Sequence, residues 1–181
     1  MDCGAEYYRR YLDGDDSGLV DMIRDYTDGL MLYLMGITGS YSLAEEMTEE
    51  TFFRIAVKKP RFSGKSAFKT WLYSIGRNAA VDYLRKHRSS LPLEETDLAD
   101  EHSLENSYLR EEQRIALHRA MNSLAPDYRQ ALHLSYFEGL SNAEIADIMR
   151  KSKRQIENIL YRAKAALRSV LEKEGFEYEI V

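Results

Sequence analysis

The most informative side chains lie between residues 152 and 168, where basic and amide groups that can contact DNA are concentrated. Lysine and arginine bind phosphates, and the amides of asparagine and glutamine can pair bidentately with adenine. Gln155 and Asn158 stand three residues apart, so in a helix both amides lie on one face. These residue types at this spacing favour recognition of nucleic acid over catalysis.

Two predicted helix starts position these side chains. Ser141 precedes Glu144 by three residues, and Ser152 precedes Gln155 by the same spacing. Each pair is typical of a capping box, in which the hydroxyl and the longer side chain bond to unpaired amides at a helix start. Residues 141–167 therefore predict a helix-turn-helix, whose second helix enters the DNA major groove. The apolar residues that would pack the two helices are Ile145, Ile148, Met149, Ile156, Ile159 and Leu160.

The formal net charge of −5 conceals two basic segments in an acidic chain. Residues 1–57 carry twelve acidic and four basic side chains. Residues 58–88 carry nine basic side chains against Asp82 alone, and residues 150–168 carry seven against Glu157 alone. This distribution predicts two separate DNA contacts, while the acidic surface avoids DNA or meets a basic protein.

Composition excludes several classes of protein. The chain has 181 residues and 44% hydrophobic content, enough for one ordinary or two small folded domains. Its single cysteine, Cys3, expected in a mobile terminus, excludes a disulfide framework and a cysteine-rich zinc site. No apolar run reaches the length of a membrane span, and the polar, acidic start is unlike a signal peptide. We therefore expect a cytoplasmic protein with no membrane insertion, no metal and no cofactor.

The N-terminal half also shows helical periodicity. Apolar residues spaced by three and four predict a helix over residues 19–33, ended by the glycines that follow. Ser42 followed by Glu45 predicts a third capping box, and the Lys-Pro pair at 59–60 ends the helix that this box opens. A further long helix is expected from about residue 67 to residue 87.

The two halves are joined by a segment of different composition. Residues 89–107 contain six acidic side chains, no lysine or arginine, and no clear apolar period. We interpret this segment as an acidic linker, because it is too charged and aperiodic to pack. The predicted fold is therefore all-α, with small helical domains at residues 1–88 and 108–181 and the helix-turn-helix in the second.

Two parts of the sequence resemble conserved regions of a known family. The resemblance to region 2 of bacterial sigma-70 family sigma factors is carried by FSGKSAFKTWLYSIGRNAAVDYLRKHR (62–88) and, before it, by AEEMTEETFFRI (44–55). The resemblance to region 4 is carried by SLAPDYRQALHLSYFEGLSNAEIADIM (123–149) and QIENILYRAKAAL (155–167). With a short linker and no middle domain, the chain is similar to the extracytoplasmic-function (ECF) type. The resemblance implies a non-enzymatic factor that binds core RNA polymerase and directs initiation at promoter DNA.

The resemblance also implies where core polymerase binds. In the family, the second conserved helix of the first domain contacts a coiled coil of the polymerase, and an acidic surface suits a basic coiled coil. A solvated acidic helix face is the alternative interpretation of the same residues. An anti-sigma factor is a further expected partner. The expected polymerase-binding residues are Glu45, Glu46, Glu49 and Phe52.

The first domain is further expected to bind the promoter −10 element as a melted strand, with a base flipped into the loop before the long helix. Gly64 allows close backbone approach, the serines can bond base edges, and Lys65 can reach a phosphate. Asn78 can read a base or, alternatively, make a buried hydrogen bond, whereas Trp71 is assigned to packing. The expected strand contacts are Ser63, Gly64, Lys65, Ser66, Lys69, Arg77, Asn78 and Arg85.

The helix-turn-helix is expected to read the −35 element as duplex. Gln155 can instead be occupied as the cap partner of Ser152, which makes Asn158 the better candidate for reading a base. Lys164 is a phosphate anchor or a solvated charge. The expected duplex contacts are Lys153, Arg154, Gln155, Glu157, Asn158, Tyr161 and Arg162.

Three positions depart from the family pattern. Many members carry glutamine where Glu49 stands, and some carry a basic residue where Glu157 stands. A carboxylate at that second position can accept from a cytosine amino group, which would alter the −35 sequence that is read. The turn of the helix-turn-helix often carries glycine, where this chain has Arg150. Because an arginine at positive φ costs about 1 kcal/mol, we expect this turn to differ slightly.

Two other functions compete with this hypothesis. A helix-turn-helix regulator could bind an operator without polymerase, but it would normally need a dimerisation helix or an effector pocket. It would also leave the first basic segment unexplained. An enzyme is disfavoured, because the four histidines lack metal-ligand spacing and no nucleophile has an obvious base.

Overall fold

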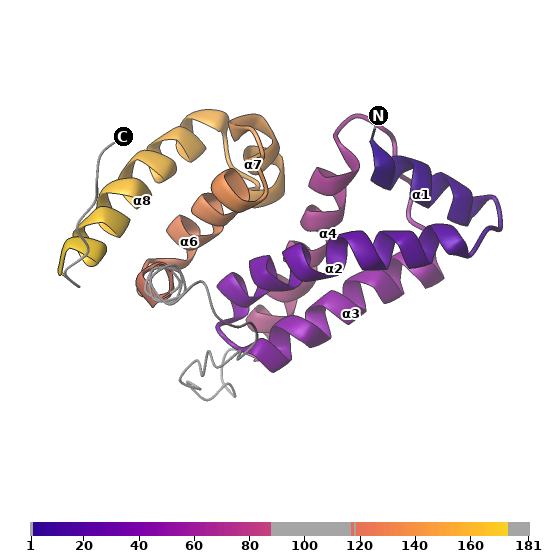
Figure 1. Cartoon of the computed structure of the whole chain (residues 1–181), viewed down its shortest axis with the longest axis horizontal. Coiled ribbons are helices and arrows are strands. Elements are labelled where there is room, and N and C mark those ends of the chain that lie inside the picture. Colours follow the sequence, from indigo (N-terminus) through magenta and orange to yellow (C-terminus); the bar gives the residue numbers. More distant parts are fainter. Residues whose placement is uncertain (1, 88–116, 118, 174–181) are drawn as a thin grey trace, which may run out of the picture.

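The computed structural model describes residues 2–87, 117 and 119–173 (Figure 1). All regular structure among these residues is helical, which confirms the predicted fold class. The linker expected at 89–107 lies outside the described residues. The helices are α1 (Cys3–Leu12), α2 (Ser17–Thr38), α3 (Tyr41–Lys58), α4 (Phe68–His87), α6 (Pro126–Leu132), the π-helical turn η1 (His133–Phe137), α7 (Asn142–Met149) and α8 (Lys153–Lys173).

Helices α2, α3 and α4 form the body of the first domain. Each packs against the other two, and their shared core includes Leu30, Leu34, Ile55 and Leu72, all fully buried. Gly76 on α4 permits the close approach of α2, because a Cβ there would lie 2.9 Å from Leu30 Cδ1. This core holds α4 rigidly, which matters because α4 carries the first basic segment.

The junction of α2 and α3 differs from the prediction. Gly39 takes the left-handed conformation (φ 70°) and ends α2. Ser40 is then extended, and its side chain accepts a hydrogen bond from the amide of Leu43 at 3.4 Å. The predicted capping box of Ser42 and Glu45 is therefore wrong. The reversal at Gly39 lets α3 begin at Tyr41, so Ser42 already lies inside the helix.

Helix α1 was not predicted, and it places Cys3 in an ordered, solvent-exposed helical turn instead of a mobile terminus. Asp2 caps it, since its side chain accepts from the amide of Ala5 at 3.4 Å. The same carboxylate accepts from the amide of Phe68 at 2.6 Å, at the first residue of α4. One side chain therefore joins the starts of two helices.

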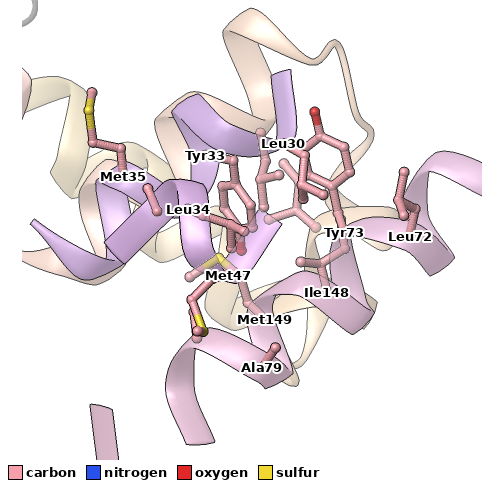
Figure 2. Packing of buried hydrophobic residues seen from close by; sticks show 14 of the residues in the cluster. Leu30, Tyr33, Leu34, Met35, Met47, Leu72, Tyr73, Ala79, Ile148 and Met149 are labelled. Atoms are coloured by element: carbon pink, nitrogen blue, oxygen red, sulfur yellow. The ribbon is translucent and has the colours of Figure 1, made fainter. Parts of the chain in front are cut away.

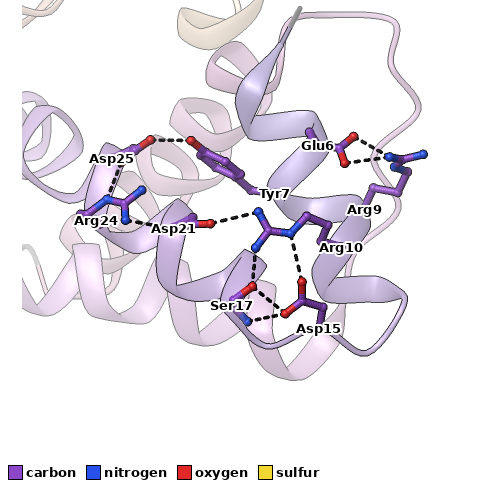
Figure 3. A network of polar contacts seen from close by, with 9 residues as sticks. All are labelled: Glu6, Tyr7, Arg9, Arg10, Asp15, Ser17, Asp21, Arg24 and Asp25. Atoms are coloured by element: carbon purple, nitrogen blue, oxygen red, sulfur yellow. Dashed lines mark hydrogen bonds and ion pairs between the residues drawn. The ribbon is translucent and has the colours of Figure 1, made fainter.

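A polar network attaches α1 to α2 (Figure 3). Arg10 pairs with Asp15 at 3.1 Å and with Asp21 at 3.0 Å. The hydroxyl of Tyr7 donates to Asp25 at 2.9 Å. These contacts are local and partly exposed, so they orient α1 without supplying much free energy.

The helix-turn-helix has the predicted form. Ser141 and Glu144 make a complete capping box at the start of α7. At the start of α8, the amide of Ser152 donates to Gln155 Oε1 at 2.7 Å, and the amide of Gln155 donates to Ser152 Oγ at 3.2 Å. Arg150 ends α7 in the left-handed conformation (φ 54°). The turn therefore keeps positive φ without glycine, contrary to the expectation that an arginine would change it.

The two domains pack against one another in this structure. Helix α4 contacts α7, and α2 contacts α6. Buried side chains of both domains form one continuous cluster, in which Tyr73 of α4 and Ile148 of α7 belong to the same core as Leu30 (Figure 2). The ring of Tyr33 lies 5.4 Å from that of Tyr73 and 5.9 Å from that of His133. The interface thus combines aromatic and apolar packing with buried polar side chains, among them Gln130 and Glu138.

Candidate nucleic-acid interfaces

Helix α8 separates its packing face from its polar face. Ile156, Leu160 and Ala163 are buried against the rest of the second domain. Ile159 is half-buried and packs against the same core. The other positions of the first three turns are exposed, and Tyr161 is 79% exposed. All seven residues expected to contact duplex DNA are therefore exposed together on one helix: Lys153, Arg154, Gln155, Glu157, Asn158, Tyr161 and Arg162.

The two amides of α8 are not equivalent. The amide oxygen of Gln155 is occupied by the amide of Ser152 in the capping box. Asn158 lies one turn further along and is exposed. The two amides therefore differ in availability, since the oxygen of Gln155 is used in the cap whereas Asn158 is exposed. The ammonium group of Lys164, expected to be solvated or to anchor a phosphate, lies 5.3 Å from the centre of the Tyr136 ring.

The loop before α4 is held by aromatic packing. The ring of Phe62 lies 5.5 Å from that of Phe68 and 5.3 Å from that of Trp71. Trp71 also packs on Tyr8 at 5.2 Å, in agreement with its assignment to packing. Behind this anchor, the loop turns through Gly64, whose φ of 69° is readily accessible only to glycine.

The polar residues of this loop lie at the surface. Ser63, Gly64 and Lys65 are exposed, and Ser66 is half-buried. The loop therefore offers a hydroxyl, a free backbone and an ammonium group beside a rigid aromatic cluster. These are suitable groups for holding a nucleotide.

Along α4 the expected strand contacts have different environments. Asn78 is half-buried, and Arg85 is exposed and pairs with Asp82 at 3.2 Å. Lys69 and Arg77 instead contact the second domain. The Nζ of Lys69 lies 2.6 Å from Glu138 Oε2, and the Nε of Arg77 donates to Gln130 Oε1 at 3.1 Å. The structure thus brings two of the eight residues into the interdomain contact and leaves the loop free.

Glu138 is the most perturbed carboxyl group at this contact. Its side chain is only 8% exposed, and Oε1 lies 3.3 Å from His133 Nε2. Burial raises its pKa, but contacts with His133, Lys69 and Tyr73 outweigh burial and lower the pKa to about 2. Burial also raises the pKa of Tyr73, and the neighbouring carboxylate of Glu138 raises it further. Glu138 is therefore ionised while the two domains are packed together, and Tyr73 is neutral.

The acidic residues of α3 border a groove between α3 and α4. Glu45, Glu46 and Glu49 are exposed, and the last two line the groove, which has a volume of about 480 Å³. Phe52 does not belong to this surface, because it is 7% exposed and packs in the core of its own domain. The outward aromatic is Phe53, which is 59% exposed and lines the groove. Phe52 lies three residues before the buried Ile55, so the helical period places Phe52 inward and Phe53 outward. Applied strictly, this period would have predicted which of the two is exposed.

Neither a metal site nor a membrane span is present in the described part of the chain. Within residues 2–87, 117 and 119–173, no group of three histidine, cysteine or acidic side chains is placed to hold a metal ion. None of the helices described over the same ranges is long and apolar enough to cross a membrane.

A helical domain with an exposed helix-turn-helix, packed on a second domain with a basic helix, indicates a DNA-binding protein. Comparison with known families agrees with this class. Residues 22–90 match sigma-70 region 2, and residues 114–167 match sigma-70 region 4. The chain belongs to the sigma-70 family of RNA polymerase sigma factors and is of the ECF type. Its function is promoter-specific transcription initiation, in which the sigma factor is not itself an enzyme.

Individual relatives span most of the chain. The ECF RNA polymerase sigma-E factor of Salmonella typhimurium is 31% identical over 134 residues, which cover 67% of this chain and 70% of that protein. The ECF RNA polymerase sigma factor SigM of Bacillus subtilis is 28% identical over 147 residues, or 80% of this chain and 90% of the relative. The fold is similar to that of the sigma factor RpoE from Bartonella quintana, solved in complex with the anti-sigma factor NepR. That likeness has a TM-score of 0.70 and 22% identity, and covers 84% of this chain and 95% of the other.

Proposed function

We propose that this chain contacts a promoter at two points, with the −35 element bound as duplex by α8 and the −10 element bound as melted strand by the first domain. The observation that carries the proposal is the simultaneous exposure of the polar face of α8 and of loop residues 63–65 on separate domains. The boundaries proposed for these domains are residues 1–88 and 108–181, with an acidic linker at 89–107.

Duplex reading is assigned to the exposed face of α8. Asn158 is proposed to pair with a base, because its amide is exposed and Gln155 is used in the cap. Lys153, Arg154 and Arg162 are proposed to bind phosphates, which position the helix without reading sequence. Glu157 and Tyr161 complete the exposed face; the carboxylate of Glu157 is suited to accept from a cytosine amino group.

Strand capture is assigned to the loop at 63–66 and to α4. The packing of Phe62 on Trp71 supports this assignment, since a rigid anchor lowers the entropic cost of holding a flipped base. Lys65 and Lys69 would hold the phosphates on either side. Asn78, Arg77 and Arg85 extend the same contact along the helix.

Contact with core polymerase is assigned to α3. Glu45, Glu46 and Glu49 form an acidic row suited to a basic coiled coil, and Phe53 supplies an apolar contact beside them. We expect the protein to act in the cytoplasm, where polymerase acts. An anti-sigma factor is a further proposed partner, because the similar fold of the Bartonella quintana sigma factor was solved with one.

In vitro transcription with purified core polymerase tests this proposal. The chain is expected to give transcripts that start at defined sites only when core polymerase is present, and to bind promoter duplex poorly alone. The start sites, mapped on a genomic DNA library, give the −35 and −10 elements directly. Promoter-independent transcripts, or nanomolar binding to duplex without core, would instead favour an operator-binding regulator.

A further inference from the structure

Helix α1 holds both ends of the loop that connects α3 to α4. The hydroxyl of Tyr8 donates to the carbonyl oxygen of Pro60 at 2.6 Å, where the loop begins. The carboxylate of Asp2 accepts from the amide of Phe68 at 2.6 Å, where the loop ends. Both contacts come from one short helix, which lies beside the loop (Figure 1). Helix α1 therefore sets the positions of the two ends of the loop relative to one another.

Asp2 supplies a cap that α4 lacks in its own sequence. Residue 67, which directly precedes α4, is alanine, and its side chain offers no acceptor to the first amides of the helix. The carboxylate of Asp2 accepts from the first of these amides, and its charge also suits the positive end of the helix dipole. The start of the helix that carries the expected strand contacts is thus fixed by α1.

The same helix supports the aromatic anchor of the loop. Tyr8 is 1% exposed, and its ring lies 6.0 Å from that of Phe68 and 5.2 Å from that of Trp71. Gly4 allows this close approach, because a Cβ at that position would collide with the ring of Phe68. Phe62, within the loop, packs on the same two rings. The position of the loop therefore depends on that of α1.

Between these anchors the loop has few contacts that fix its shape. Residues 61–66 make no hydrogen bond to any other residue that the structure describes. Their conformation is therefore set by the two ends of the loop and by the ring of Phe62. A change at either end would alter the arrangement of the exposed groups at 63–65.

We propose that Asp2 and Tyr8 are positioning residues for strand capture, because they hold the loop in the shape that a flipped −10 base requires. This inference rests on the proposed capture of the melted strand by this loop. Both residues act through the loop and not through contact with DNA. A preformed loop binds a base at a lower entropic cost and distinguishes one base from another more sharply. Residues 22–90 match sigma-70 region 2, so this support comes from outside the matched segment.

The test measures how well polymerase holoenzyme distinguishes one −10 base from another. The probe is a labelled promoter found by transcript mapping, kept duplex over the −35 element and single-stranded over the −10 element. Each −10 base is changed in turn, and the ratio of the two affinities is the discrimination at that base. Asp2→Asn keeps one oxygen for the cap on α1 and loses the second acceptor, whereas Tyr8→Phe keeps the ring and loses the bond to Pro60. Each should lower discrimination about threefold to tenfold, the usual effect of one hydrogen bond.

Two matched controls lie on the same helix. Glu6→Gln removes a carboxylate that pairs with Arg9, and Tyr7→Phe removes a hydroxyl that donates to Asp25. Neither group contacts the loop, so both variants should distinguish −10 bases as well as the unaltered chain does. Affinity for core polymerase and discrimination at the −35 element should stay the same in all four variants.

A purely structural role for Asp2 and Tyr8 predicts a different result. It would lower the urea midpoint and weaken binding of every −10 base equally, and the discrimination ratio would not change. Unchanged ratios in both Asp2→Asn and Tyr8→Phe, beside clear discrimination by the unaltered chain, would overturn this inference alone. Lack of −10 discrimination by the unaltered chain would overturn the proposed strand capture as well.

Discussion

Helices α4 and α8 carry the two basic segments of the sequence, and their surroundings differ. On α8 the residues expected to meet DNA are all exposed. On α4, Lys69 and Arg77 are held by side chains of the other domain. Charge along the sequence therefore predicts where nucleic acid can bind, but it does not tell whether the surface is available. Availability depends on contacts between residues far apart in the chain.

The packing of the two helices explains the difference. Helix α8 buries one apolar stripe, with Ile156 and Leu160 at its centre, and leaves the opposite side free. Helix α4 is buried on two sides. Leu72 and Ala79 are buried in the core of the first domain, while Thr70 donates to Glu144 of α7 and Tyr73 lies beside Glu138. A helix packed on two sides has little surface left for a ligand.

The largest effect is expected from the same substitution made on both helices. Tyr73→Ala removes a fully buried ring and should lower the free energy of unfolding by about 3–5 kcal/mol. Tyr161→Ala removes a ring that is 79% exposed and should change it by less than about 0.5 kcal/mol. Urea unfolding followed by circular dichroism measures both. Equal losses in the free energy of unfolding would show that the Tyr161 side of α8 is also buried in solution.

The second prediction concerns reading by α8. Asn158→Ala should weaken discrimination of the −35 element by about 1–3 kcal/mol, the usual contribution of a bidentate amide. Binding of polymerase holoenzyme to promoter duplexes with one −35 base changed measures this loss. Ser169→Ala, further along the same helix and exposed, is the control and should have no effect. If affinity for core polymerase fell instead, the assigned roles of the two domains would be wrong.

The third prediction uses the pKa of Glu138. The contact between the two domains holds this pKa at about 2, against an ordinary value of 4.5. A lowered pKa stabilises this contact above pH 4.5, and the stabilisation is lost as pH falls from about 4.5 to about 2. The ratio of separated to packed domains should rise by at most about tenfold per pH unit in that range. The distance between spin labels at Tyr41→Cys and Ser169→Cys, with Cys3→Ser, measures this ratio. Glu138→Gln should remove this part of the pH dependence while other carboxyl groups titrate as before.

Local features of this fold were predictable, and contacts between distant residues were not. The capping boxes at Ser141 and Ser152 were predicted correctly, because each depends on residues three positions apart. The box at Ser42 was wrong, because the left-handed Gly39 had already turned the chain. Helix α1 was missed although the Asp2 cap on Ala5 is a local signal; the bond of Asp2 to Phe68 joins distant residues and could not be predicted.

The same limit applies to the candidate interfaces. The exposed face of α8 follows from periodicity alone, because its apolar stripe lies within one helix. The pairing of Lys69 with Glu138 does not, since both residues are ordinary surface types and lie in separate domains. Phe52 and Phe53 fall on the predictable side of this limit. They are adjacent aromatics on α3, and the helical period through Ile55 already places the first inward and the second outward, as the structure shows.

The smallest effect is expected at two helix ends that share the left-handed conformation. Arg150 ends α7 at φ 54° and Lys59 ends α3 at φ 42°. Glycine relieves the strain of positive φ, but it also adds entropy to the unfolded chain, so the net gain for Arg150→Gly should be at most about 1 kcal/mol.

Lys59→Gly should raise the free energy of unfolding by less, or lower it, because it also removes a contact. The ammonium group of Lys59 lies 4.6 Å from the centre of the Tyr11 ring, and such a cation–π contact contributes about 0.5–1 kcal/mol. Urea midpoints of the two variants, measured side by side, test the difference. A larger gain for Lys59→Gly than for Arg150→Gly would show that the contact with Tyr11 contributes nothing, and that backbone strain alone governs both helix ends.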